Sequence, residues 1–155
     1  RACVYAIKIL IEVSVEQARE IECAVLGEED PEVSSVGEIV PGAEFYDYQT
    51  KYIDDCATLI IPADLPGATV KQIQEMSMCA FRAIDCSGLA RVDFLIGKDG
   101  EILLNEINTM PGFTPISMYP KLWAADGLNY PDLIDRLIQI ALARHSRRRD
   151  LKTTL

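Results

Sequence analysis

The sequence lacks a run of apolar residues long enough to cross a membrane, for which about 18 to 20 are needed. Its first residues also lack the basic, apolar and small-residue zones of a signal peptide. No internal repeat and no Gly/Ser-rich linker divides the 155 residues, and 49% of them are hydrophobic, which is enough for a buried core. We therefore expect one soluble, cytoplasmic domain over residues 1–155 that makes no membrane contact.

Several common catalytic signatures are missing. The single histidine, His145, lies in a basic segment, and there is no Gly-x-Ser-x-Gly motif, which argues against a nucleophilic triad. There is no Walker-type phosphate loop. The five cysteines form no Cys-x-x-Cys pair, which argues against both a disulfide framework and a zinc site.

Basic residues are scarce and unevenly placed. The chain has 15 Lys and Arg against 24 Asp and Glu, a net charge of −9. Residues 144–155 carry a charge of +4 and the remainder −13. Such an acidic body argues against nucleic-acid binding, which needs a positive surface. The basic end is interpreted as a solubilising helix end, with a patch for an anionic partner as the alternative.

Short β-rich runs and segments of helical periodicity share the chain, which predicts an α+β fold with a mainly antiparallel sheet flanked by helices. A helix after an N-cap at Thr69 and a short helix at 117–125 are indicated by their caps and breakers. In the last helix, one apolar face is predicted from Leu133, Ile134, Leu137, Ile138 and Ala141. Strands are predicted over residues 6–13, 21–26, 36–40, 89–96 and 101–108.

The last two strands read as a hairpin, because Asp99-Gly100 is a typical two-residue hairpin loop. With that loop, Lys98 would face Glu101, Asp93 would face Glu106 and Arg91 would face Asn108. Side chains alternate along a strand, so the last two pairs would lie on the same face of the sheet. The hairpin therefore gathers four polar side chains on one surface.

Two carboxylates directly opposite each other repel, so a cation should lie near Asp93 and Glu106. Carboxylate and amide oxygens suit Mg²⁺ or Mn²⁺, and Asn108 offers the amide. Arg91 beside them could bind a phosphate or a developing oxyanion. The alternative is a water-facing hairpin surface on which Arg91 is simply the counterion of Asp93.

Two further segments stand out. Gly112 follows the hairpin in a Pro-Gly turn, where its N–H could approach an oxyanion, although a plain tight turn explains it too. Residues 45–52 carry three tyrosines and Lys51. This pattern is typical either of a tyrosine-rich edge strand or of a loop that covers a substrate.

Three segments in this order resemble D-alanine–D-alanine ligases of the ATP-grasp superfamily. They are Arg-Val-Asp-Phe at 91–94, Leu-Asn-Glu-Ile-Asn-Thr-Met-Pro-Gly-Phe-Thr at 104–114 and Ser-Met-Tyr-Pro at 117–120. Tyr-Asp-Tyr at 46–48 and Lys-Tyr at 51–52 add to the resemblance, which spans residues 11–143. It implies an enzyme that uses ATP to join two D-alanine molecules through an acylphosphate, for peptidoglycan synthesis.

The resemblance also implies roles for individual residues. Asp93, Glu106 and Asn108 would hold two Mg²⁺ or Mn²⁺ ions on the ATP phosphates. Arg91 and the Gly112 N–H would stabilise the tetrahedral intermediate.

The remaining roles implied by the resemblance concern the substrates. Glu20 would bind the ATP ribose, and Asn105 together with Glu106 would contact the nucleotide. Lys51 and the catalytic Tyr52 would belong to a loop that closes over the γ-phosphate. The second D-alanine would be contacted by Ser117 and Met118.

One departure from the family is large, because its amino-terminal and central parts have no counterpart here. We therefore expect a carboxy-terminal part that works as a homodimer or with the missing amino-terminal half. Two alternatives stay open. The first is another ATP-grasp carboxylate–amine ligase. The second is a catalytically silent folding or dimerisation module that packs on a partner through the helix at 133–141.

Overall fold

The computed structural model describes residues 12–41 and 58–151. The predicted strand at 6–13 lies almost wholly outside these ranges, and its last two residues, 12 and 13, are not in a strand. The tyrosine-rich segment 45–52, with Lys51 and Tyr52, lies outside them as well.

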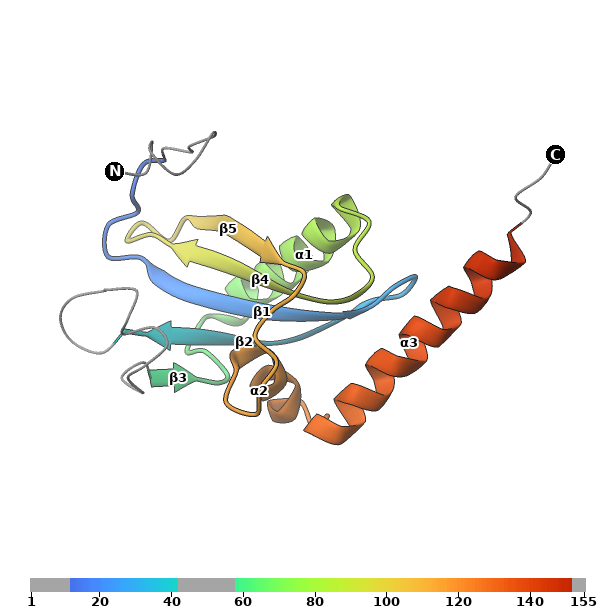
Figure 1. The fold of residues 1–155 in the computed structure, drawn as a ribbon. Coiled ribbons are helices and arrows are strands. Elements are labelled where there is room, and N and C mark those ends of the chain that lie inside the picture. Colours follow the sequence, from blue (N-terminus) through green and yellow to red (C-terminus); the bar gives the residue numbers. More distant parts are fainter. Residues whose placement is uncertain (1–11, 42–57, 152–155) are drawn as a thin grey trace, which may run out of the picture.

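Five antiparallel strands form one sheet in the order β3-β2-β1-β4-β5 (Figure 1). The strands are β1 (Arg19–Gly27), β2 (Glu32–Val40), β3 (Thr58–Ile60), β4 (Gly88–Ile96) and β5 (Ile102–Asn108). The helices are α1 (Gly67–Ala83), α2 (Met118–Ala125) and α3 (Tyr130–Asp150). The predicted α+β class is confirmed.

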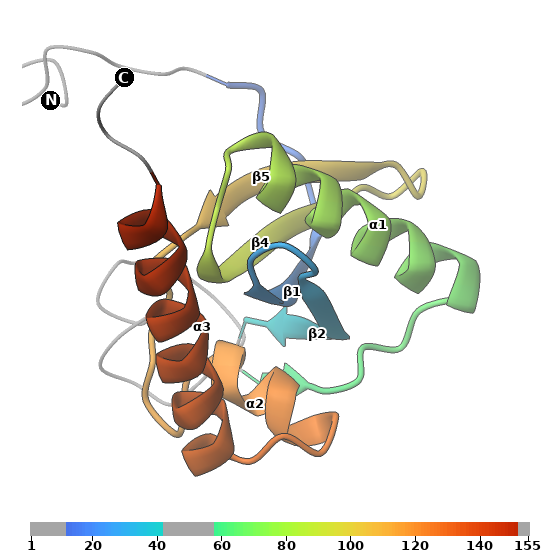
Figure 2. The same ribbon diagram turned by 90° about the vertical axis from the view of Figure 1, so that its right-hand side faces the viewer.

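The sheet separates two buried clusters, with α1 on one face and α2 and α3 on the other (Figure 2). In β4 the alternation is regular, so that Val92 and Phe94 are buried beneath α1 while Leu89 packs with α2 and α3. Tyr119 of α2 is fully buried and donates a hydrogen bond to the Val25 carbonyl, 2.9 Å away. Each face of the sheet therefore has its own helical cover.

Helix α1 begins three residues earlier than predicted. Pro66 occupies the N-cap position, and the Val70 N–H donates to its carbonyl at 3.0 Å, so Thr69 lies inside the first turn and the prediction that it caps the helix is wrong. Ile73, Ser77 and Phe81 form the buried face. The Ser77 hydroxyl, although buried, donates to the Ile73 carbonyl at 2.8 Å and so does not lack a partner.

Helix α3 packs along a narrower line than predicted. Leu133 is fully buried and Leu137 and Ile140 pack against the same cluster, whereas Ile134 and Ile138 are 38% and 51% exposed. The predicted five-residue face is therefore wrong in part, because only Leu133, Leu137 and Ile140 pack against the buried cluster. The second half of α3 extends past the end of the sheet (Figure 1), where Arg144 and Arg147 make ion pairs and no wide apolar face is buried.

Ion pairs hold α3 to the turn between β1 and β2. Arg136 pairs with Glu32, and Arg144 and Arg147 pair with Glu28. The basic end of the chain thus has acidic partners within the molecule. Within residues 12–41 and 58–151, no helix is both long and apolar enough to span a membrane.

The hairpin of β4 and β5 turns through a longer loop than predicted. Gly97 rather than Lys98 faces Glu101, because the Gly97 N–H donates to the Glu101 carbonyl at 3.0 Å. Gly100 has a φ of +82°, the left-handed conformation that a three-residue hairpin loop requires. The prediction of a two-residue loop is wrong, and the strand register next to the turn differs from the predicted one by one residue.

A β-bulge between Asp93 and Phe94 cancels this shift. Phe94 pairs with Leu104 and Asp93 pairs with Glu106, so Asn105 is an extra residue in β5. Beyond the bulge, Asp93 faces Glu106 and Arg91 faces Asn108, as predicted.

We expect Leu133→Ala to lower the free energy of unfolding by about 2–5 kcal/mol, because it leaves a cavity in a closed cluster. Ile138→Ala, the matched control on the same helix, should cost less than about 1 kcal/mol. Urea unfolding followed by fluorescence of Trp123, the sole tryptophan and a member of that cluster, measures both. Equal losses would contradict the assigned packing face.

Candidate functional site

Two rows of side chains cross the face of the sheet that α2 and α3 cover in part. Glu22 in β1 pairs with Asp93 in β4, which pairs with Glu106 in β5. Two residues along each strand, and so on the same face, Ala24 pairs with Arg91, which pairs with Asn108. Three carboxylates therefore stand side by side across three strands.

Arg91 lies between two of these carboxylates. Its Nε and Nη2 donate to the two oxygens of Asp93 at 2.8 and 2.7 Å, and its Nε lies 3.2 Å from Glu22 Oε2. The side chains of Arg91, Asp93 and Glu22 are 18%, 15% and 7% exposed. Water screens such a group weakly, so the charges depend on one another. The hydrogen bonds to Asp93, with the charges of Glu22 and Glu106, raise the pKa of Arg91 above its ordinary value, although burial opposes them.

A pocket of about 320 Å³ opens beside this row. It brings together four residues that were predicted to bind metal or nucleotide, and the bulge places Asn105 at its wall. The lining residues are Glu20, Ile21, Glu22, Asp93, Phe94, Leu95, Asn105 and Glu106.

Among the described residues, four carboxylates line this pocket, those of Glu20, Glu22, Asp93 and Glu106, and the neighbouring cation is Arg91. In the part of the chain that the structure describes, no three His, Cys, Asp or Glu side chains form a set that could hold a metal ion by themselves. Mg²⁺ commonly takes one or two protein carboxylates and completes its shell with substrate phosphates. The site therefore fits a cation that arrives with a phosphate ligand.

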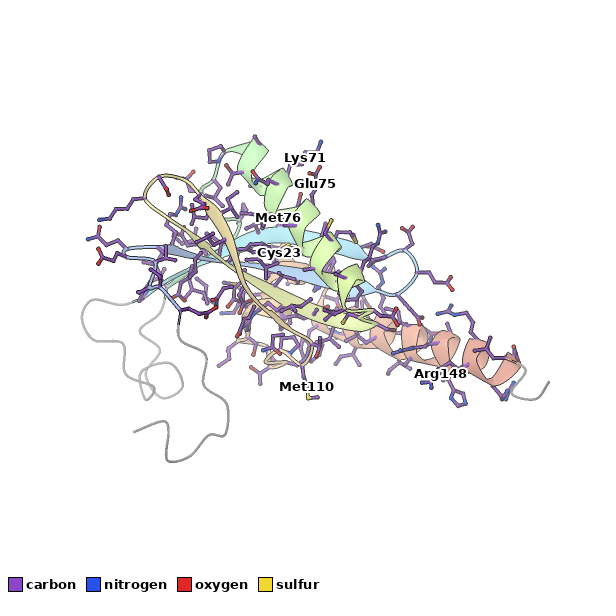
Figure 3. The ribbon with its side chains drawn as sticks, turned by 90° about the horizontal axis from the view of Figure 1, so that it is seen from above. Cys23, Lys71, Glu75, Met76, Met110 and Arg148 are labelled. Atoms are coloured by element: carbon purple, nitrogen blue, oxygen red, sulfur yellow. The ribbon has the colours of Figure 1, made fainter. Side chains whose placement is uncertain are left out.

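Asn108 is partly engaged by its own loop, since its Oδ1 accepts a hydrogen bond from the Met110 N–H at 3.0 Å. A carbonyl oxygen has two lone pairs, so this bond leaves one for a metal or a ligand. The bond also fixes the direction in which the chain leaves β5. Met110 itself is 88% exposed, and its side chain points away from the body (Figure 3).

Aromatic contacts anchor the loop between β5 and α2. The Phe113 ring lies 5.9 Å from that of Tyr119 and 5.4 Å from that of Tyr130, measured between centroids. The Tyr130 hydroxyl donates to the Phe113 carbonyl at 2.9 Å. Because Tyr119 and Tyr130 belong to α2 and α3, both helices hold this loop in place.

Gly112 lies in this loop, with Ser117 directly beside it. A Cβ on Gly112 would come within 3.1 Å of the Ser117 Oγ, so the position is tight. Its φ is not in the left-handed region, so close approach rather than backbone conformation favours glycine here. Gly112 is exposed, and its N–H donates no hydrogen bond to any residue within 12–41 or 58–151.

Ser117 and Met118 start α2 in different environments. Ser117 is at the N-cap, but its hydroxyl accepts from the Thr114 N–H at 3.1 Å and contacts the Thr114 hydroxyl at 2.9 Å. Met118 is 5% exposed and packs in the core over Gly37, where a Cβ would lie 3.0 Å from its sulfur. Ser117 therefore lies at the surface and the Met118 side chain does not.

Glu22 is a residue of this site for which the sequence patterns predict no role. The sequence does contain one indication of its role. Glu22 is a carboxylate within the apolar run 21–26, and a carboxylate is buried only when it has a partner. The partner, Arg91, is far away in sequence and adjacent only through strand pairing. Lys51 and Tyr52 lie outside the described ranges, so their predicted roles stay predictions.

Residues 1–139 match the protein-family model for the D-Ala-D-Ala ligase C-terminus. Among curated proteins, the D-alanine–D-alanine ligase of Acetivibrio thermocellus is 57% identical over 143 residues, which are 92% of this chain and 38% of that enzyme. D-alanine–D-alanine ligase A of Salmonella typhimurium is 51% identical over 149 residues, 96% of this chain and 41% of that enzyme. The chain thus spans about two fifths of the length of these relatives.

Solved structures agree with the sequence matches. The D-alanine–D-alanine ligase of Coxiella burnetii superposes with a TM-score of 0.73 at 46% identity, covering 85% of this chain and 34% of that one. The VanG D-Ala:D-Ser ligase of Enterococcus faecalis gives 0.69 at 38% identity, with 80% and 36% covered. The Bacillus anthracis D-alanine–D-alanine ligase, solved as a complex with ATP, gives 0.69 at 31% identity, with 85% and 42% covered.

We expect Arg91→Met to lower the free energy of unfolding by about 3–5 kcal/mol, because it removes the guanidinium that lies between the buried Glu22 and the half-buried Asp93. Arg136→Met removes an exposed partner of Glu32 and should cost about 1 kcal/mol or less. Chemical unfolding of both variants measures the difference. Similar losses would mean that the Arg91 pair is as weak as a surface pair.

Proposed function

Because the chain belongs to the D-alanine–D-alanine ligase carboxy-terminal family, we propose that it supplies the metal-binding and second-substrate part of an ATP-dependent ligase. One observation carries the proposal. Asp93 and Glu106 line one pocket from adjacent strands, and the pair of Arg91 and Asn108 lies next to them on the same face of the sheet. The Gly112 loop follows directly after β5. Residues 1–155 would form the catalytic carboxy-terminal domain of an ATP-grasp enzyme.

The proposed reaction joins two D-alanine molecules in two steps. In the first, a carboxylate oxygen of one D-alanine takes the γ-phosphoryl group of ATP, which gives an acylphosphate and ADP. In the second, the amine of the other D-alanine, having lost a proton, attacks the acyl carbon, and inorganic phosphate leaves. The product would be D-alanyl-D-alanine for peptidoglycan. Because the reaction consumes ATP, the enzyme would work in the cytoplasm.

Asp93, Glu106 and Asn108 would hold two Mg²⁺ or Mn²⁺ ions on the ATP phosphates. When bound, these ions neutralise phosphate charge that the acidic pocket could not accept by itself. Glu20 at the other side of the pocket would bind the ribose, and Asn105 would contact the nucleotide from the bulge. Lys51 and Tyr52 would close over the γ-phosphate.

Arg91 and the Gly112 N–H would stabilise the oxyanion of the tetrahedral intermediate. Both are suited to this role, since Arg91 stays charged and the Gly112 N–H is not used within the described ranges. The Ser117 hydroxyl, at the surface beside Gly112, would bind the carboxylate of the second D-alanine. The Met118 side chain supports α2 from the core, so a contact with substrate would come from its backbone.

A second amine substrate deserves a direct test. The VanG structure, 38% identical to this chain, is that of a D-Ala:D-Ser ligase. The same site could therefore use D-serine in place of the second D-alanine, which would be a different carboxylate–amine ligase.

The test is a chimera in which this chain replaces the matching 143 residues of the Acetivibrio thermocellus ligase. We expect the chimera to release ADP from MgATP only when D-alanine is present, and to form D-alanyl-D-alanine detectable by mass. D-Serine supplied together with D-alanine tests whether the site accepts D-serine as the second substrate. Asp93→Ala should lower turnover by at least about 100-fold.

The matched control for the chimera is Glu75→Gln, which removes a carboxylate on the outer face of α1, where Glu75 pairs with Lys71 (Figure 3). This variant should keep full activity. A folded chimera that binds ATP but releases no ADP in response to D-alanine would refute the ligase proposal and favour a silent folding or dimerisation module.

We expect Glu106→Gln in the 155-residue chain to reduce Mg²⁺-dependent ATP affinity at least about tenfold, because an amide lacks the charge that binds the cation. The fold should be retained, since Glu106 is exposed. Isothermal titration with ATP, with and without Mg²⁺, measures the change. Unaltered Mg²⁺-dependent binding would contradict the metal assignment of Glu106.

A further inference from the structure

We propose that Glu22 is a positioning residue, whose buried carboxylate keeps Arg91 in place so that Asp93 can exchange its contact with Arg91 for one with a metal ion. This inference rests on the proposed function and deepens it. It assigns a role to a residue that the predicted set of ligands does not include.

The first step concerns Asp93. Both of its oxygens accept hydrogen bonds from Arg91, at 2.8 and 2.7 Å. A carboxylate offers about four lone-pair sites, and this two-point contact takes two of them. A cation bound at the remaining sites lies beside the guanidinium, so the two positive charges repel and the contact of Arg91 with Asp93 is weakened.

The second step concerns Arg91 at that moment. Its side chain is 18% exposed, so water cannot fully replace a lost carboxylate partner. Glu22 Oε2 lies 3.2 Å from the Arg91 Nε, and the Glu22 side chain is 7% exposed. Glu22 is thus a second carboxylate already in contact with the guanidinium, and it would retain Arg91 when Asp93 turns toward the cation.

The strand register explains why Glu22 can do this. Glu22 pairs with Asp93, and Ala24 pairs with Arg91, so Arg91 reaches Glu22 along the diagonal between neighbouring positions of β1 and β4. Both strands are central in the sheet, and Glu22 has the core strands on either side of it. The Glu22 carboxylate is consequently fixed by the fold, while Asp93 is next to the open edge formed by β5.

A matched control exists on the opposite face. Arg19 makes a two-point contact with Glu38, at 2.7 and 2.6 Å, between β1 and β2. Glu38 pairs with Ile21, whose side chain belongs to the α1 cluster, so this pair is separated from the pocket by the sheet. Glu38→Gln therefore removes one charge from a similar Arg–Glu pair without touching the site.

The first experiment needs neither metal nor nucleotide. In the ¹⁵N-labelled 155-residue chain, the Arg91 Nε–H signal, assigned by its loss in Arg91→Lys, is compared in wild type, Glu22→Gln and Glu22→Asp. We expect Glu22→Gln to accelerate hydrogen exchange at this Nε–H by about threefold or more, because a charged partner is lost. Glu38→Gln should change the Arg19 signal and leave that of Arg91 unaltered.

Glu22→Asp separates charge from position. It keeps the negative charge but withdraws the carboxylate by one methylene, so exchange at Arg91 should fall between wild type and Glu22→Gln. An Arg91 signal unchanged in Glu22→Gln, or fully restored in Glu22→Asp, would overturn the positioning role.

The second experiment uses the chimera with the Acetivibrio thermocellus ligase and measures its Mg²⁺ binding in the presence of ATP by titration calorimetry. Glu22→Gln should weaken Mg²⁺ binding by about tenfold when Arg91 is present, and by clearly less in an Arg91→Met background, where no guanidinium has to be retained. Equal effects in both backgrounds would mean that Glu22 acts on the metal only through its charge. That outcome would overturn the proposal that Asp93 exchanges its contact with Arg91 for one with the metal.

The two experiments distinguish the inference from the proposed function. If Glu22→Gln changes the Arg91 signal but the chimera with the Acetivibrio thermocellus ligase binds no ATP with Mg²⁺, the proposed function is contradicted and the pairing of Glu22 with Arg91 is supported. Mg²⁺-dependent binding that is the same in wild type and Glu22→Gln would support the proposed function and overturn the role of Glu22.

Discussion

The contact of Arg91 with Asp93 and Glu22 is the interaction on which the rest of the site depends. Pairing of β1, β4 and β5 puts Glu22, Asp93 and Glu106 in adjacent positions, where like charges are unfavourable. The register itself cannot move by one residue, because the other side chains of β4 would then leave the cluster under α1. The fold therefore fixes the repulsion, and Arg91 compensates part of it inside the sheet.

Small and apolar residues decide where this acidic surface ends. Helix α2 lies over Gly37, which has no side chain to obstruct Met118 and Leu122, and over Ala24. On the same face, toward β5, the positions become charged and no helix covers them within the described ranges. The pocket thus lies on the part of this sheet face that is left uncovered, while α2 and α3 bury the other part.

Sequence patterns predict the fold class, the later strands and the facing pairs of the hairpin. The facing pairs are correct, but the loop length from which they were derived is wrong. The Asp-Gly pair predicts a two-residue loop, whereas the loop has three residues, and the bulge at Asn105 cancels the resulting shift in register. A bulge leaves no signal in an alternating pattern, so neither deviation could be predicted. Leu133 was correctly placed in the core, whereas Ile138 was not, because helical periodicity shows an apolar face without showing how much surface lies opposite it. Glu22 was missed since its partner is defined by strand pairing, which is a property of the folded sheet.

The charges of the site limit what this part of the chain can do by itself. Among the described residues, four carboxylates line the pocket and Arg91 adjoins it, with its hydrogen bonds of 2.8 and 2.7 Å both made to Asp93. Such a surface attracts cations and repels phosphate. A nucleotide can therefore approach it only with its own metal ions, or with positive side chains from segments beyond those described. The relatives are more than twice as long as this chain, and 31–57% identity to the relatives and structures compared shows a shared fold for this part only. If the proposed function holds, the acidic pocket would form one half of a phosphate site, and the other half would have to be positive.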